Sequence, residues 1–324
     1  MGILNTIFTS GMVLQANKPI RIFGEGQGRV TVRLGTQSAS TVADGAWLLE
    51  LAPMGYGGPY EILVEHDGEE TVLSDVWMGD VFLLAGQSNM ALKLMDTNHP
   101  VERYEANDRV RLYAVDRPGP DKISSSDGWV ALTRENAEEF PAIGYHVGVM
   151  LASENRRIGL ISCSQGASII QSWMPREVAA YEQYQVKERG ISHTKYEFNA
   201  EGYLYEWMTS KILPYSLHTV LWYQGESNVS DSGEEARIYL SLLEGLIDAW
   251  RREFKDSALP FIVIQLADFD GRSGEPWTNI QNAQMQAQDV IPHVRTVVCR
   301  DVCERDDIHP ATKHILAARI AALL

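Results

Sequence analysis

The sequence predicts an α/β protein: a three-layer α/β/α fold around a flavodoxin-like parallel sheet, preceded by a small β-sandwich domain. The first 77 residues contain short runs of alternating apolar and polar residues separated by glycine turns. From Val81 onward, apolar runs of strand length alternate with helical patterns. We therefore expect an N-terminal β domain over residues 1–77 and an α/β domain over residues 78–324.

The expected β domain contains three strand-like segments. "RVTVRLG" alternates, "GAWLLELAP" follows a turn, and "PYEILVEHDGEETVLSDV" resembles a hairpin that turns at His66-Asp67-Gly68. Short strands at regular spacing with glycine turns are typical of a small sandwich. No cluster of titratable residues stands out in this region, so we expect it to support the second domain.

The second region alternates strands with helices. The expected strands are 81–85, 110–114, 157–162, 218–223, 261–266 and 295–300. The expected helices are 234–254, 277–290 and 310–324, with Pro310 in the first turn of the last one. Buried strands that alternate with helices form parallel sheets, and ligands bind beyond the carboxyl ends of such strands.

Composition limits the classes of partner. The 324 residues carry a formal net charge of −15, which argues against nucleic acid and anionic membrane surfaces. No segment has the apolar length of a membrane span. The three cysteines provide neither a disulfide framework nor a zinc-ligand pattern. No signal-peptide pattern is visible, so the sequence as it stands predicts a cytoplasmic protein, or a secreted one whose signal peptide was removed.

Polar and small residues gather where the expected strands end. The four segments are Gly86-Gln87-Ser88-Asn89, Ser164-Gln165-Gly166, Gln224-Gly225-Glu226 and Asp306-Asp307-Ile308-His309. Acyl transfer needs a nucleophile, a base within hydrogen-bond reach and a group that orients the base. Ser88 can be the nucleophile and His309 the base, with Asp306 or Asp307 holding the imidazole.

The same reaction needs hydrogen-bond donors for the developing oxyanion. Gly166 can offer a backbone N–H with no side chain in the way, and Gln224 can offer its side-chain amide. Each of these roles thus has a candidate at the expected end of a strand.

Each residue also has a structural interpretation. Ser88 could be a helix N-cap, Asp306-Asp307 a turn that caps the last helix, and Gln224-Gly225-Glu226 an ordinary strand-to-helix loop. The esterase pattern Gly-x-Ser-x-Gly is absent because Met90 occupies its last position. A metal site would use Glu304, Asp306, Asp307 and His309, a weak set of ligands. The joint placement at strand ends favours the hydrolase.

With these residues identified, the sequence resembles the SGNH/GDSL hydrolase superfamily, in particular the sialate O-acetylesterase-like carbohydrate esterases. The resemblance is carried by "GDVFLLAGQSNM" (79–90), "IGLISCSQGASIIQSWMP" (158–175), "LPYSLHTVLWYQGESN" (213–228) and "DDIHP" (306–310), with "SGMVLQANKPIRIFG" near the N-terminus. Relatives often have Gly-Gly-Thr where this chain has Gly166-Ala167-Ser168, which bears on substrate preference.

The resemblance implies roles for individual residues. Ser88 would be the nucleophile, His309 the base and Asp306 the acid, with Asp307 as a substitute by register. The oxyanion donors would be the N–H groups of Ser88 and Gly166 and the side chain of Gln224. The supporting or substrate-binding residues would be Gln87, Asn89 and Glu226. No metal or organic cofactor is implied.

The expected function is therefore a serine esterase that removes O-acetyl groups from an acetylated carbohydrate through an acetyl-enzyme. Three alternatives stay open: an acetylxylan esterase acting on neutral plant glycans, a carbohydrate-binding protein without turnover, and a metal-dependent hydrolase. The sequence carries no signal for oligomeric state.

Overall fold

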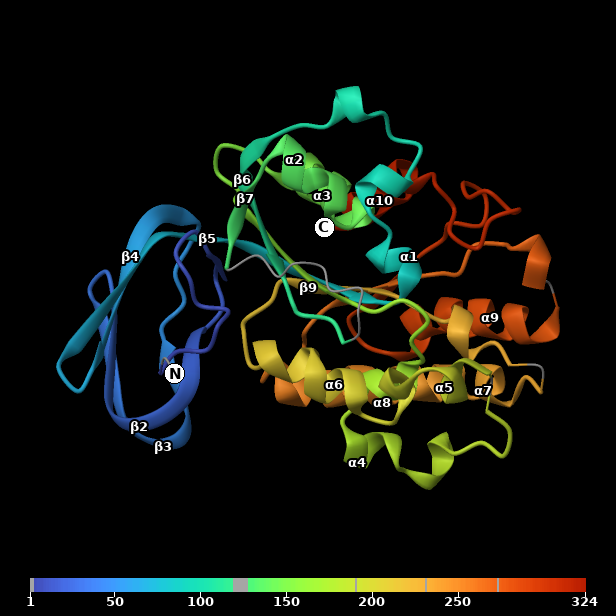
Figure 1. The fold of residues 1–324 in the computed structure, drawn as a ribbon, viewed down its shortest axis with the longest axis horizontal. Helices are drawn as coiled ribbons and strands as arrows, with labels where there is room; N and C mark the ends of the chain where they lie inside the picture. Colours follow the sequence, from blue (N-terminus) through green and yellow to red (C-terminus); the bar gives the residue numbers. More distant parts are fainter. Residues whose placement is uncertain (1–2, 119–127, 190, 231, 273) are drawn as a thin grey trace.

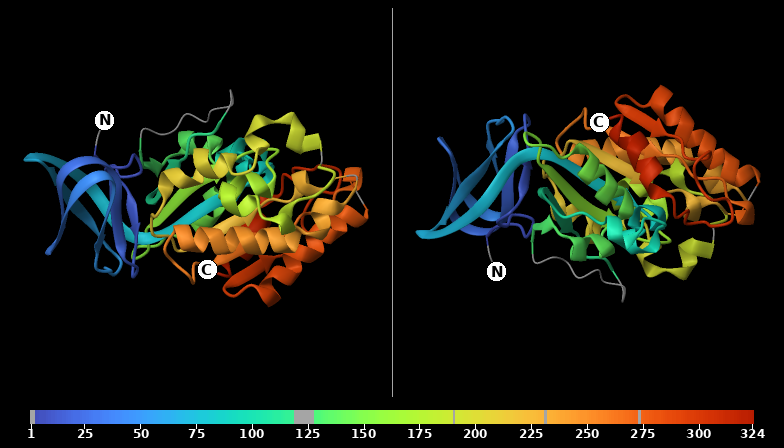
Figure 2. Two further views of the ribbon diagram at one scale, coloured as in Figure 1. Left: turned by 90° about the horizontal axis from the view of Figure 1, so that it is seen from below. Right: turned by 90° about the horizontal axis from the view of Figure 1, so that it is seen from above.

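The protein is an α/β molecule with helices on both faces of a central sheet (Figure 1). This computed structural model describes residues 3–118, 128–189, 191–230, 232–272 and 274–324. The N-terminal strands extend from one end of the molecule, and the strand β5 runs from them into the central sheet (Figure 2). The predicted α/β class is confirmed.

All six expected strands are present: five have ends that differ by a few residues, and 81–85 is the last part of the longer strand β5. The strands are β1 (Val13–Gln15), β2 (Ile20–Leu34), β3 (Gln37–Leu51), β4 (Gly57–His66), β5 (Glu69–Gly86), β6 (Asn107–Ala114), β7 (Val130–Leu132), β8 (Ile158–Ser164), β9 (Thr219–Tyr223), β10 (Phe261–Ile264) and β11 (Val294–Val297). The parallel strands lie in the order β6-β8-β5-β9-β10-β11, and β7 pairs antiparallel with β6.

The second half of β5 lies at the centre of this sheet. Its residues Val81 to Ala85 are 0% exposed because β8 and β9 flank them in the sheet and helices cover both faces. Burying one such Val, Leu or Phe side chain contributes roughly 1.5–3 kcal/mol. β6 and β8 lie on one side of β5 and β9 to β11 on the other. The end of β5 is therefore the topological switch point, where ligands bind in such sheets.

Helices lie on both faces of the central sheet. They are α1 (Ser88–Ala91), α2 (Arg134–Glu139), α3 (Ala142–Leu151), α4 (Arg176–Ala179), α5 (Ile191–Lys195), α6 (Tyr203–Trp207), α7 (Glu234–Arg237), α8 (Tyr239–Glu253), α9 (Glu275–Val290) and α10 (Lys313–Ala321). α3 packs against α10 on one face, and α8 packs against α9 on the other (Figure 1). Of the helices described, none has both the length and the apolar character needed to cross a bilayer.

Two expected helices differ from the structure. The predicted helix 234–254 is divided at Ile238, whose φ of −100° and ψ of 4° leave the helical region between α7 and α8. The predicted helix 310–324 begins only at Lys313, so Pro310 precedes α10 rather than lying in its first turn. The helix 277–290 is found as α9.

The N-terminal strands form one hydrogen-bonded layer with β5. β2 pairs antiparallel with β3 and β4, and β4 pairs with the first half of β5. The hairpin at Asp67-Gly68 is confirmed, because both residues have positive φ and His66 pairs with Glu69. A separate β-sandwich is not confirmed, since β5 continues unbroken into the parallel sheet. The boundary at residues 77/78 falls inside β5 and stays a prediction.

Gly86, the last residue of β5, is required by the close approach of β9. Its φ is +132°, and a Cβ at this position would lie 2.1 Å from the carbonyl oxygen of Tyr223. We expect Gly86→Ala to lower the free energy of unfolding by about 3 kcal/mol or more, because overpacking adds to the backbone strain. Urea unfolding measures this loss.

Gly35→Ala is the matched control. Gly35 also has a positive φ of +57°, but nothing lies within 4 Å of the point where its Cβ would be added. This variant should lose only about 1 kcal/mol, the cost of the backbone conformation alone. Equal losses in the two variants would show that the contact with Tyr223 is unimportant.

Candidate active site

Ser88 is the first residue of α1, directly beyond the central strand. Gln87 occupies the N-cap position with extended backbone, and its carbonyl oxygen accepts the N–H groups of Met90 and Ala91. The interpretation of Ser88 as the N-cap is therefore wrong. Its neighbours Gln87 and Asn89 are buried, whereas Ser88 is half-buried. The local fold thus presents the Ser88 hydroxyl at the sheet edge between two enclosed amides.

Two backbone N–H groups lie beside this hydroxyl. The Gln165 N–H donates to the Gly86 carbonyl oxygen (3.0 Å), which fixes the segment after β8 against the end of β5. A Cβ on Gly166 would lie 3.7 Å from the Cβ of Ser88. Within the described residues, neither the Ser88 nor the Gly166 N–H has a recorded acceptor. Both N–H groups therefore lack an internal acceptor, and their role as oxyanion donors stays a prediction.

Gln224 differs from its predicted role as a free donor. Its side chain is 0% exposed, and its Nε2 lies 2.8–3.1 Å from the oxygens of Gln87, Ser168 and Asn228. Its Oε1 accepts a hydrogen bond from the Tyr239 hydroxyl. The amide hydrogens of Gln224 therefore already have acceptors within the protein. The side chain connects the segments that follow the strand ends.

Gln87 is the partner that Gln224 supports. Its Oε1 also lies within reach of the N–H groups of Gly225 (3.3 Å) and Ser227 (3.2 Å). Its own backbone N–H donates to the Tyr223 carbonyl oxygen at 2.9 Å. Gln87 thus holds the segment before Ser88 against the end of β9.

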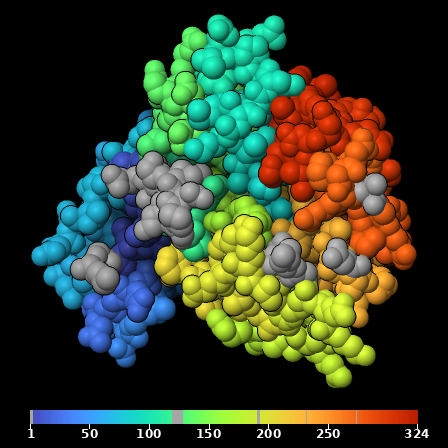
Figure 3. Space-filling view, turned by 45° about the vertical axis from the view of Figure 1, so that its right-hand side comes forward, coloured from blue at the N-terminus to red at the C-terminus, as the bar shows by residue number. Residues whose placement is uncertain are grey.

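His309 lies in the loop before α10 and is half-buried. The Asn89 Nδ2 donates to the carbonyl oxygen of Ile308 at 2.8 Å. This hydrogen bond joins the residue after Ser88 to the residue before His309, across 219 positions of sequence. In the space-filling view, the cyan-green segment that follows Ser88 lies beside the red C-terminal segment (Figure 3).

The two aspartates differ in their contacts. The Asp307 Oδ1 accepts the backbone N–H of His309 at 2.8 Å, whereas Asp306 has no recorded contact with any described residue. Both side chains are exposed. The interpretation of this pair as the cap of the last helix is not supported, because Thr312 holds the N-cap position of α10.

Burial lowers the pKa of the His309 imidazole below its ordinary value; Asp307 opposes this shift and Lys313 adds to it. A lowered pKa keeps the imidazole neutral near neutral pH, as a general base requires. Activity that depends on His309 should therefore persist somewhat below the pH at which an ordinary histidine protonates.

Asn89 and Glu226, both predicted as supporting or substrate-binding residues, are in direct contact. The Asn89 Nδ2 donates to the Glu226 Oε1 at 2.5 Å, and both residues are 3% exposed. The Asn89 Oδ1 accepts from the Nζ of Lys313 at 2.7 Å. Sequence reasoning missed Lys313, although a signal was present. It shares the helical spacing of the buried Leu316, Ala317 and Ile320.

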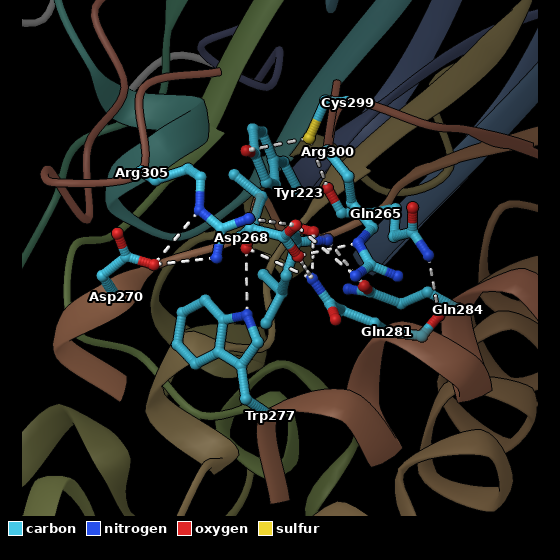
Figure 4. A network of polar contacts seen from close by, with 12 residues as sticks. Tyr223, Gln265, Asp268, Asp270, Trp277, Gln281, Gln284, Cys299, Arg300 and Arg305 are labelled. Carbon is cyan, nitrogen blue, oxygen red and sulfur yellow. Dashed lines mark hydrogen bonds and ion pairs between the residues drawn. The ribbon is translucent and has the colours of Figure 1, made fainter. Parts of the chain in front are cut away.

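The segment before the aspartates is held by a second polar network (Figure 4). The Asp268 Oδ1 accepts from the Nε of Arg300 at 2.7 Å and from the Nε2 of Gln281 at 3.1 Å. Arg305 pairs with Asp268 at 3.4 Å. Burial acts to raise the pKa of Asp268, but these donors and charges lower it overall. An ionised Asp268 thus ties the segment that leads to His309 to β10 and α9.

Together, a parallel α/β sheet with a hydroxyl, free N–H groups and an imidazole at its switch point defines the class of candidate serine hydrolases. The chain belongs to the family of sialic acid-specific acetylesterases among the carbohydrate esterases, because the model of that family matches residues 78–321. The resemblance seen in the sequence is confirmed.

Individual relatives agree with this family. The chain is similar to a carbohydrate acetylesterase from Xanthomonas citri, with a TM-score of 0.85 and 30% identity over 98% of this chain and 73% of that structure. It is 25% identical to the sialate O-acetylesterases of Homo sapiens and Pongo abelii over 91% of its length. The chain spans 62% of the length of these two relatives.

Proposed function

We propose that the protein is a serine O-acetylesterase that removes acetyl groups from acetylated sugars. The observation that carries this proposal is the hydrogen bond from Asn89 to Ile308, which brings the Ser88 and His309 segments together at the switch point. The two unoccupied N–H groups beside Ser88 and the named activities of the relatives also support it.

In the proposed reaction, the Ser88 Oγ attacks the acetyl carbonyl carbon while the imidazole of His309 takes the hydroxyl proton. The carbonyl oxygen becomes an oxyanion that accepts the N–H groups of Ser88 and Gly166. The bond from carbon to the sugar oxygen then breaks, and His309 returns the proton to that oxygen. The products of this half-reaction are the free sugar hydroxyl and acetyl-Ser88.

In the second half, water attacks the acetyl-enzyme and gives a proton to His309. The tetrahedral intermediate collapses as His309 returns the proton to the Ser88 Oγ, and the acetic acid released ionises to acetate in solution. Asp306 orients the imidazole and stabilises the imidazolium in both halves. Gln87, Gln224, Asn89 and Glu226 hold the strand ends in place without contacting the reacting atoms. The partner is an acetylated carbohydrate, with no nucleic acid or membrane required.

The test is acetate release from a panel of O-acetylated sialic acid, acetylated xylo-oligosaccharides and peracetylated simple sugars. We expect release from at least one of these substrates, and the ranking of kcat/KM names the sugar class. The rate should be unchanged by a chelator, since the proposed groups are all side chains and backbone N–H groups. Binding of intact acetylated sugar without acetate release would instead identify a carbohydrate-binding protein.

A further inference from the structure

Three buried polar side chains from separate elements meet behind the candidate site. Asn89 comes from α1, Glu226 from the short 3-10 turn Glu226–Asn228 and Lys313 from the start of α10. Their exposed fractions are 3%, 3% and 1%. A buried ammonium is costly unless it is paired, so its presence here calls for an explanation beyond packing.

The Asn89 amide lies between the two charges with its dipole in the favourable direction. Its Oδ1 faces the Lys313 ammonium at 2.7 Å, and its Nδ2 faces the Glu226 carboxylate at 2.5 Å. The second carboxylate oxygen of Glu226 is buried without a hydrogen bond. Removing either charge would therefore leave the other poorly compensated in a dry environment.

These contacts connect the segment that carries Ser88 with the segment that carries His309. Asn89 directly follows Ser88, and the same Nδ2 donates to the carbonyl oxygen of Ile308, directly before His309. Lys313 Nζ also lies 5.4 Å from the ring centroid of Tyr223, within the range of a cation–π contact. The carbonyl oxygen of Tyr223 in turn accepts the N–H of Gln87. The Lys313 ammonium is thus connected to the segment around Ser88 in two ways: directly through Asn89, and indirectly through Tyr223 and Gln87.

We propose that Lys313 is a positioning residue for this reaction: its buried ammonium, balanced by Glu226 and bound to Asn89, fixes Ser88 relative to His309. The inference rests on the proposed esterase function. Lys313 acts through Asn89 and through its charge, and it contacts no reacting atom.

The electrostatic part of the argument involves the groups around both residues. Burial lowers the pKa of His309 most, Asp307 raises it and Lys313 lowers it. Burial also lowers the pKa of Lys313 itself, and four groups oppose that shift: Cys303, Cys299, Glu226 and Glu304. Replacing Lys313 with a neutral residue removes a cation near the imidazole. The imidazolium becomes easier to form, so the pKa of His309 should rise.

The test compares Lys313→Met with the wild-type protein on the best substrate of the panel. We expect kcat to fall on the order of 10²-fold, the loss that a small misplacement of reacting groups produces, with KM nearly unchanged. The acidic limb of the pH profile of kcat/KM should move to higher pH. A loss of stability alone would lower the amount of active enzyme without moving this limb.

Lys93→Met is the matched control for the change of residue and of net charge. Lys93 lies two positions after α1, is partly exposed and pairs with Glu139 at 2.9 Å. Because an exposed pair contributes little, this variant should stay within about twofold of wild type, with an unmoved acidic limb.

The double variant Lys313→Met/Glu226→Gln separates charge from folding. Removing both charges should recover much of the thermal stability lost in Lys313→Met, because no uncompensated carboxylate remains. The acidic limb should nevertheless stay at higher pH, since the cation is still absent. If stability and pH profile both returned to wild-type values, Lys313 would be a structural residue only and the proposal would be overturned.

NMR titration of the His309 imidazole gives a readout that needs no substrate. The His309 pKa should be higher in Lys313→Met than in wild type and unchanged in Lys93→Met. An equal pKa in all three proteins would overturn the inference even in an active esterase. A shifted pKa in a protein that releases no acetate would leave the placement of Lys313 intact and overturn the esterase proposal instead.

Discussion

Ser88→Ala is expected to lower kcat/KM for acetate release by on the order of 10⁴- to 10⁶-fold. The Oγ is the atom that forms the acetyl-enzyme in the proposed reaction. The fold should be unaffected. Ser88 is half-buried, does not cap α1 and makes no recorded side-chain hydrogen bond among the described residues.

The measurement is acetate release by both proteins at equal concentration, with circular dichroism and thermal unfolding to compare their folds. Ser227→Ala is the matched control, because Ser227 also follows a strand end but is only 7% exposed. Its backbone N–H, which this variant keeps, donates to the Gln87 Oε1. The control should keep activity within a few fold. Near-wild-type rates in Ser88→Ala would remove Ser88 from the mechanism.

The strands of the parallel sheet were predictable because a strand that is buried on both faces consists of a continuous run of apolar residues. Val81–Ala85 is such a run, and its end identified Ser88 as a residue to inspect. The N-terminal strands were less predictable. Alternation shows which face of a strand is buried but not which sheet it joins. The continuity of β5 from the N-terminal strands to the central sheet is therefore invisible in the pattern.

The sequence indicated which residues lie at the candidate site, but not which contacts their side chains make. Residue type and strand end indicated Gln224, but they did not encode the direction of its side chain, which points into a network with Gln87 and Asn228. Long-range pairing is similarly hidden: nothing local in the sequence links Asn89 to Lys313, 224 positions away. The buried face of α10 did contain the signal for Lys313, because a lysine on an apolar stripe needs a partner.

Asp306→Asn is the second change with a large expected effect. Replacing the carboxylate that orients a catalytic histidine leaves the geometry largely intact but lowers kcat on the order of 10³- to 10⁴-fold, because the imidazole loses its correct tautomer and its stabilised cation. Asp306 lies three residues before His309, and its carboxylate is exposed and without a recorded contact among the described residues. No other described residue therefore competes for this carboxylate.

Asp307→Asn is the matched comparison, since it makes the same chemical change one position away. The Asp307 Oδ1 accepts the backbone N–H of His309, and an asparagine oxygen can accept the same hydrogen bond. We therefore expect a loss of about tenfold or less. Asp307 also acts to raise the pKa of His309. Removing its charge should lower that pKa, so the acidic limb of kcat/KM should move to lower pH.

The two variants are compared by kcat and by the pH profile of kcat/KM on one substrate. We expect a large loss of kcat in Asp306→Asn. In Asp307→Asn we expect a small loss of kcat and an acidic limb at lower pH. This result would assign orientation of the imidazole to Asp306 and support of the turn to Asp307. The reverse ranking would make Asp307 the acid, with one carboxylate serving both the backbone and the imidazole of His309. Equal small losses would mean that neither aspartate orients His309, and Lys313 and Asn89 would then be the main constraints on its position.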